Sequence, residues 1–182
     1  DKMTTEAQNC LLKTLEEPPE FVTIILIGSN ESAFLDTIKS RCMILRFNKI
    51  SDENIIKFLE ENYQTKVNSQ IMLEAFQGSI GKAIQLQDKQ EEYEQIENVI
   101  VNLENRDKID TLNNAEAIYK AKEEKFEILD YINIILLDLA KKSSKYAMCI
   151  NIVEDTKRRL QSNANYDMSI DNMLLKLWEQ VH

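Results

Sequence analysis

Few side chains in this sequence have the type and spacing to do chemistry. Histidine occurs once, as His182, so Ser-His-Asp, Cys-His and histidine-metal sites lack their usual central group. The three cysteines, Cys10, Cys42 and Cys149, match no zinc-ligand spacing and are expected to be reduced thiols. We therefore expect no hydrolase of these types and no metal site. The best remaining candidate is Arg41, because its planar guanidinium can bind a phosphate at two points.

Arg41 follows Ser40 and precedes Cys42, at the expected junction of a short helix with a strand. From such a base its guanidinium could reach a phosphate that a neighbouring subunit holds. An arginine at the start of a strand can equally be a surface residue that pairs with a carboxylate and contributes little energy. The residues alone leave both interpretations open.

The other candidates each have an ordinary structural explanation. Ser29 ends an expected strand, where serine is commonly a turn or capping residue. Lys82 is typical of a solvated helical lysine. Glu16 and Glu17 are adjacent and lie on different helix faces, so we interpret them as solvated acids rather than as a catalytic pair. The basic run at residues 157–159 is expected to be an exposed helix face rather than a DNA contact.

Composition indicates which elements position these residues. Only 3 glycines and 2 prolines occur among 182 residues, and 43% of the residues are hydrophobic, which predicts a mostly helical globular protein. The net charge of −9 disfavours general electrostatic binding to the phosphate backbone of nucleic acid. No apolar run approaches the roughly 20 residues of a membrane span, so no membrane partner is expected. Since methionine first occurs at Met3, we expect a fragment of a longer protein.

Residues 1–48 are expected to alternate helix, strand, helix and strand. The first helix has a capping box at Thr5 and Gln8 and ends before Pro18. The predicted strands cover residues 21–27 and 42–47, and the second helix covers residues 31–38. Helical periodicity takes over from residue 51, which predicts three helices up to residue 88 and five from residue 89 to residue 182.

Two strings resemble those of a known family. They are Leu-Leu-Lys-Thr-Leu-Glu-Glu-Pro-Pro at residues 11–19 and Thr-Ile-Lys-Ser-Arg-Cys at residues 37–42, and together they resemble the bacterial DNA polymerase III clamp loader, within the AAA+ superfamily. The resemblance implies three domains: the C-terminal part of an α/β nucleotide-binding core with two strands at residues 1–48, a three-helix lid at 49–88, and a five-helix collar for oligomerisation at 89–182.

The same resemblance implies roles for individual residues. Ser29 falls at the sensor 1 position, and Ser40, Arg41 and Cys42 match the Ser-Arg-Cys motif of the family. ATP-hydrolysing subunits carry an arginine at sensor 2, where this chain has Gly81 followed by Lys82. That difference favours resemblance to the delta-prime class of subunits, which are structural and do not hydrolyse ATP.

The implied function is that of an arginine finger, in which Arg41 acts in trans on the ATP and Mg of a neighbouring subunit while this chain holds no cofactor and has no catalytic activity. Implied partners are the ATPase and delta subunits and, through the complex, the sliding clamp and primed DNA, all in the cytoplasm. Two alternatives stay open. One is an ATP-hydrolysing subunit of the same loader, and the other is a helical interaction module without nucleotide chemistry.

Overall fold

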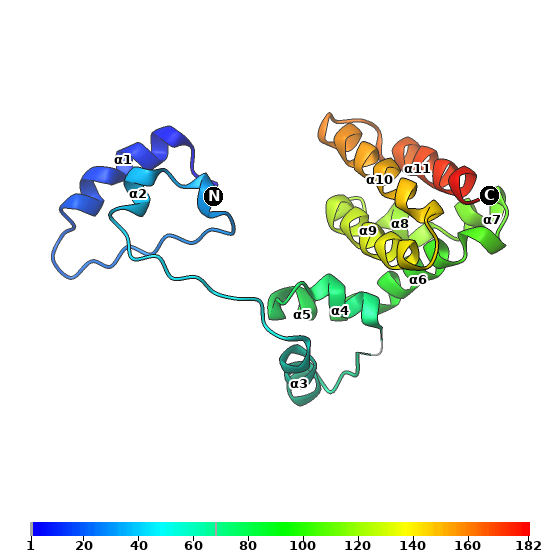
Figure 1. Ribbon diagram of the computed structural model, residues 1–182, viewed down its shortest axis with the longest axis horizontal. Helices are drawn as coiled ribbons and strands as arrows, with labels where there is room; N and C mark the ends of the chain where they lie inside the picture. The colour runs from blue at the N-terminus through cyan, green and yellow to red at the C-terminus, as the bar shows by residue number, and fades with distance from the viewer. Residues whose placement is uncertain (1, 68) are drawn as a thin grey trace. The chain divides into compact units, whose positions relative to one another are not determined.

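The structure is a computed structural model that describes residues 2–67 and 69–182 (Figure 1). Asp1, the first residue of the expected core segment, lies outside the described residues. Helices dominate the described part of the chain, where no strand is assigned, so the expectation of a mostly α protein is confirmed. The chain divides into two compact units, residues 1–48 and residues 49–182.

The first unit contains α1 (Thr5–Glu16), the 3₁₀ turn η1 (Glu31–Ala33) and α2 (Asp36–Lys39). The N-cap of α1 is Thr4, whose hydroxyl accepts a hydrogen bond from the Ala7 backbone N–H at 3.3 Å. The expected capping box at Thr5 and Gln8 is therefore wrong. The expected single helix at 31–38 is divided, because η1 and α2 are separate elements.

The two expected strands do not form. Residues 21–27 and 42–47 are neither helix nor strand in the structure, and Figure 1 shows both as long connecting segments. A strand requires a neighbour that satisfies its backbone N–H and C=O groups, and no described residue supplies a ladder to either segment. The pattern predicted side chains buried on both faces, whereas Phe21, Ile27 and Phe47 are almost fully exposed.

The second unit begins with α3 (Asp52–Tyr63), α4 (Gln70–Phe76) and α5 (Ile80–Asp88). The hydroxyl of Ser69 caps α4 and that of Ser79 caps α5, each by accepting a backbone N–H. Between these two helices Gln77 and Gly78 have left-handed backbones, with φ of 51° and 74°, and reverse the chain. The reversal places the buried Phe76 of α4 in the same apolar core as the residues of α3.

The remaining helices are α6 (Gln90–Val101), α7 (Lys108–Asn113), α8 (Glu116–Lys120), α9 (Lys125–Lys142), α10 (Lys145–Gln161) and α11 (Tyr166–Val181), with the 3₁₀ turn η2 (Leu103–Asn105) after α6. Helix α9 contacts α4, α6 and α10, which explains why it is apolar on most of its surface. Residues 108–120 form two short helices rather than one, because the chain turns at Asn114 and Ala115 between α7 and α8. No helix within the described ranges has the length and apolar character needed to cross a bilayer.

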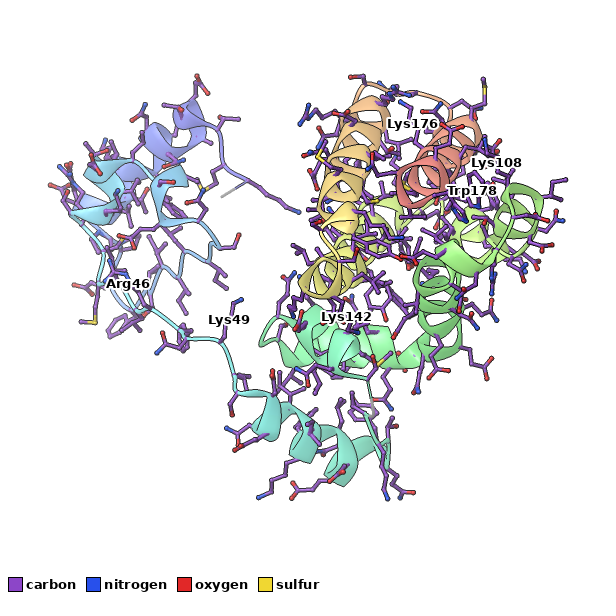
Figure 2. All side chains as sticks on the ribbon, turned by 45° about the vertical axis from the view of Figure 1, so that its right-hand side comes forward. Arg46, Lys49, Lys108, Lys142, Lys176 and Trp178 are labelled. Carbon is purple, nitrogen blue, oxygen red and sulfur yellow. The ribbon has the colours of Figure 1, made fainter. Side chains whose placement is uncertain are left out.

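Polar contacts also join the helices of this unit. Lys157 of α10 is only 13% exposed, and its ammonium lies 2.6 Å from both the Asp130 and the Glu154 carboxylate. At the other end of the bundle the indole N–H of Trp178 donates to the Arg106 carbonyl at 2.7 Å. Figure 2 shows Trp178 and Lys108 close together, and the Lys108 ammonium lies 5.0 Å from the centre of the indole ring.

Candidate functional site

The candidate site centres on Arg41, which a short turn after α2 holds in place. Ser40, the C-cap residue of α2, keeps a helical backbone, and the Arg41 N–H donates to the Ile38 carbonyl at 3.0 Å. Ile38 is buried, so this turn is anchored by a buried apolar side chain. The Arg41 side chain is 35% exposed and therefore extends from a fixed backbone into a partly solvated position.

The guanidinium of Arg41 is held on two sides. Its Nε donates to Glu16 Oε1 at 2.9 Å, and one terminal nitrogen, Nη2, donates to the same oxygen at 2.5 Å. The other terminal nitrogen, Nη1, donates to the Thr37 carbonyl at 3.0 Å. Glu16 is the last residue of α1. The guanidinium thus joins the C-terminal end of α1 to the C-terminal end of α2.

Gln8 of α1 is the second connection between these elements. Its side chain is 3% exposed, with Nε2 donating to the Ala33 carbonyl at 2.9 Å and Oε1 accepting from the Leu35 N–H at 2.8 Å. The amide therefore pairs with backbone on both sides of the turn that leads into α2. This arrangement fixes α1 and α2 as one framework, so that Glu16 and Arg41 face each other across it.

The other two residues of the predicted motif have local roles in this structure. The Ser40 hydroxyl donates to the Thr37 carbonyl at 3.1 Å and accepts a long contact from Arg41 Nη1 at 3.4 Å. Cys42 is half-buried and its thiol forms no disulfide. The structure therefore brings Ser40 and Arg41 together on one turn, while Cys42 follows as a packing residue.

Ser29, the expected sensor 1 residue, is exposed just before η1. It lines an open hollow together with Arg46 and Cys42, and Arg41 is outside the described lining of that hollow. Arg46, labelled in Figure 2, donates through two nitrogens to the two carboxylate oxygens of Glu31, each at 3.0 Å. The sequence pattern gave no indication of this second arginine-carboxylate pair.

The expected sensor 2 residues, Gly81 and Lys82, lie in the first turn of α5, in the second unit. The Lys82 ammonium donates to the Gln77 side-chain oxygen at 2.6 Å. A Cβ at Gly81 would meet only the Ser79 hydroxyl, at 3.8 Å, so the position has room for a larger side chain. The absence of an arginine there is a property of the sequence and is not imposed by crowding.

Sequence reasoning missed Glu16, which was interpreted as a solvated acid. It is half-exposed, yet it forms the ion pair with Arg41. The two residues are 25 positions apart, and no local spacing connects them. Within residues 2–67 and 69–182, no group of three His, Cys, Asp or Glu side chains is arranged to hold a metal ion.

Comparisons with known proteins agree with the motif. The profile of the family described as DNA polymerase III, delta subunit, matches residues 1–51, the segment that carries both Glu16 and Arg41. DNA polymerase III subunit gamma of Buchnera aphidicola from Acyrthosiphon pisum is 48% identical over 52 residues, which are 29% of this chain and 14% of the relative. DNA polymerase III subunit delta' of Bacillus subtilis is 44% identical over 55 residues, 30% of this chain and 17% of the relative.

A eukaryotic relative matches in the same way. Replication factor C subunit 3 of Arabidopsis thaliana is 40% identical over 60 residues, 33% of this chain and 17% of the relative. The chain thus covers less than a fifth of the length of each of these three relatives. The N-terminal segment that carries the Ser-Arg-Cys turn is thus similar to AAA+ proteins. Within that class, it is similar to clamp-loader subunits.

Proposed function

We propose that this chain is part of a delta-prime class subunit of the DNA polymerase III clamp loader. It is a structural subunit that does not hydrolyse ATP and that supplies Arg41 in trans to the ATP site of a neighbouring subunit. The observation that carries this proposal is how Arg41 is held: its backbone is fixed by the turn after α2, and its guanidinium is bound by Glu16 on one edge and by the Thr37 carbonyl through Nη1.

A fixed guanidinium is what phosphoryl transfer requires of a neighbouring subunit. Charge develops on the equatorial oxygens of the transferred group, and an arginine supplied in trans stabilises it, with typical effects of about 10³ to 10⁵ on the rate. Positioning accounts for much of this effect, because the arginine must already be in place when the charge develops. In this proposal ATP and Mg belong to the neighbour, and this chain holds no cofactor.

Gly81 supports the non-hydrolysing assignment. The position has space for a Cβ but carries no side chain, and the ammonium of the adjacent Lys82 donates to Gln77. The competing candidate is an ATP-hydrolysing subunit of the same loader, which the 48% identity to a gamma subunit favours. A phosphate-binding loop with its lysine, and paired Walker B acids, in the complete protein would decide for hydrolysis.

The wider arrangement is part of the same proposal. Residues 1–48 are the C-terminal part of an α/β core, in which residues 21–27 and 42–47, unpaired among the described residues, would become strands only beside a neighbouring strand of the complete core. Residues 49–88 are the lid, and residues 89–182 are the collar. The partners are the ATPase and delta subunits of a hetero-oligomer that acts in the cytoplasm. Through that complex the chain helps to load the sliding clamp on primed DNA.

The test replaces Arg41 in the complete protein, which is then reconstituted with the other loader subunits. Arg41→Ala is expected to leave assembly intact, since a partly exposed arginine contributes little stability. DNA-stimulated ATPase should fall partly, because the other sites keep their own arginines, and clamp loading should fall further. Arg46→Ala is the matched control, because it also removes an exposed arginine paired with a glutamate of this unit. Unchanged rates for Arg41→Ala would overturn the proposal.

The proposal that this chain has no catalytic activity can be tested separately, by measuring its binding and hydrolysis of ATP. A protein of residues 1–182 is expected neither to bind ATP stoichiometrically nor to hydrolyse it, since the sensor 2 position lacks its arginine and no described cluster could hold Mg. Titration calorimetry with ATP and Mg checks this. A Mg-dependent binding isotherm of one ATP per chain would favour the ATPase alternative.

A further inference from the structure

We propose that Glu16 is the positioning residue for Arg41, an inference that rests on the trans role proposed above. Glu16 Oε1 accepts from both Nε and Nη2, which together form one side edge of the guanidinium. A carboxylate on that edge makes a charge-assisted contact and fixes the plane of the group. The arginine is thereby held in one orientation before any phosphate arrives.

The remaining edge of the guanidinium is suited to receive a phosphate. Nη1 and Nη2 form the end of the fork, and Nη2 carries a second N–H that makes no hydrogen bond to the described residues. Nη1 makes one good contact, to the Thr37 carbonyl, and one long contact of 3.4 Å to the Ser40 hydroxyl. A phosphate oxygen could replace the Ser40 hydroxyl as the partner of Nη1, while Glu16 keeps its hydrogen bonds to Nε and Nη2. Glu16 and the phosphate therefore bind different edges and do not compete.

The position of Glu16 is not explained by the stability of its own helix. It is the last residue of α1, where the partial negative charge of the helix end disfavours an acid. Pro18 and Pro19 already end the helix without it. An acid at this point is compensated by a cation; Lys13 also lies in the last turn of α1, but the cation that contacts Glu16 is Arg41.

The neighbouring Glu17 provides a matched comparison. It is exposed, and its carboxylate makes no hydrogen bond or ion pair with the described residues. The two glutamates share sequence context, charge and the effect of the helix end. They differ in their contact with Arg41.

The two possible roles of the Glu16–Arg41 ion pair, stabilising the fold or positioning Arg41, predict different effects on ATPase when Glu16 is replaced. With the side chains of Glu16 and Arg41 49% and 35% exposed, the pair should contribute little to folding. If the pair serves only the fold, the loss of Glu16 affects ATPase no more than the loss of Glu17. If the pair positions Arg41, the loss of Glu16 slows turnover, and only while Arg41 is present.

The test is a double-mutant cycle in the reconstituted loader. Glu16→Gln and Glu17→Gln are each made in the complete protein with Arg41 and with Arg41→Ala, and DNA-stimulated ATPase is measured against ATP concentration. Glu16→Gln should lower kcat, with KM for ATP nearly unchanged. The loss should not exceed that of Arg41→Ala, and a displaced catalytic group costs up to about 10²-fold. Glu17→Gln should match the wild type, and Glu16→Gln should add nothing to Arg41→Ala.

The outcomes separate this inference from the function on which it rests. If Arg41→Ala slows turnover and Glu16→Gln does not, the positioning role is wrong while the trans arginine stands. An equal loss from Glu16→Gln in both backgrounds also overturns it, because Glu16 would then act without Arg41. If Arg41→Ala changes nothing, the trans role and the positioning role are both wrong.

Discussion

Gly78 and Lys49 lie so close together that a Cβ added to Gly78 would overlap the Cβ of Lys49 and lie 3.0 Å from its Cα. The Ile50 N–H also donates to the Gly78 carbonyl at 3.0 Å. Figure 2 labels Lys49 on the segment that leads into α3. The turn between α4 and α5 is thus packed directly against the start of the second unit.

Replacing Gly78 should therefore destabilise this unit. Gly78→Ala combines a left-handed backbone, with φ of 74°, and a clash with Lys49, and we expect a loss of about 1 to 3 kcal/mol in the free energy of unfolding. Gly81→Ala is the control, because its Cβ has room in a helix, and it should be neutral or stabilising by up to about 1 kcal/mol. Denaturant titration of both variants checks this, and equal effects would contradict the role given to Gly78.

The ion cluster at Lys157 predicts a pH dependence of stability. A hydrogen bond from Lys157 holds the pKa of Glu154 below its usual value. Burial alone would lower the pKa of Lys157, but the hydrogen bonds to Asp130 and Glu154 outweigh it and raise that pKa. The contribution from Glu154 is fully present above its unfolded pKa, near 4.5, and is lost as the pH falls through the folded value. The contribution from Lys157 is present at neutral pH and is lost only in strong alkali.

Lys157→Met should remove this acid-sensitive contribution. At pH 7 we expect it to destabilise the protein by about 1 kcal/mol. Between pH 7 and pH values below 4.5, its stability should fall less than that of the wild type. Lys176→Met, which removes an exposed lysine of α11 (Figure 2), should keep the wild-type slope. Urea denaturation at several pH values measures how the free energy of unfolding changes with pH. Parallel curves for Lys157→Met and the wild type would show that the Lys157 cluster is not the source of the acid sensitivity.

The cysteines should differ in reactivity although all three are free. Cys149 is fully buried, and desolvation raises the pKa of its thiol to about 11. Because the thiolate is the nucleophile, Cys149 should resist alkylation in the folded protein, whereas the exposed Cys10 should react readily. Iodoacetamide followed by peptide mass spectrometry tests this before and after denaturation. Modification of Cys149 at the rate of Cys10 under native conditions would mean that α10 is not packed as described.

The expected boundary between lid and collar near residue 89 can be tested by truncation. Residues 89–182 should form a helical bundle, because their helices bury many apolar side chains. They should also be less stable than residues 49–182, because α4 packs against α9 and Lys141 pairs with Glu74 of α4 at 3.2 Å. Circular dichroism during thermal unfolding compares the two proteins. An unfolded 89–182 segment would show that the lid helices are part of the collar core.

The long helices were predictable because their periodicity reflects burial on a single face. Ile170, Met173, Leu174 and Leu177 recur at helical spacing and are all buried in α11. The turn between α7 and α8 was not predictable, because Ile109, Leu112, Ala115 and Tyr119 keep one apolar spacing across it. Continuous periodicity does not distinguish one helix from two that share a face.

The candidate site was predictable only as a motif. The Ser-Arg-Cys string identified Arg41, but its partner Glu16 and the Gln8 amide that fixes α1 to α2 depend on contacts across 25 to 27 positions. Gln8 was assigned to a local capping box, but its side chain instead makes long-range hydrogen bonds to the backbone of Ala33 and Leu35. The prediction of strands at residues 21–27 and 42–47 was wrong because it used only a local apolar pattern. A strand also depends on pairing with a neighbouring strand, which a local pattern does not reveal.

The placement of Trp178 decides how this protein can be followed in solution. The single tryptophan and all six tyrosines of the sequence come after residue 48, so the tyrosine and tryptophan absorbance and fluorescence arise entirely from the second unit. The indole stacks on the His182 ring at 3.9 Å and bonds to the Arg106 carbonyl, so its emission should change when α11 separates from the segment before α7. Melting of the framework that carries Arg41 should leave the tryptophan emission unchanged, so it has to be followed by another signal, such as the far-ultraviolet circular dichroism of α1 or an introduced chromophore.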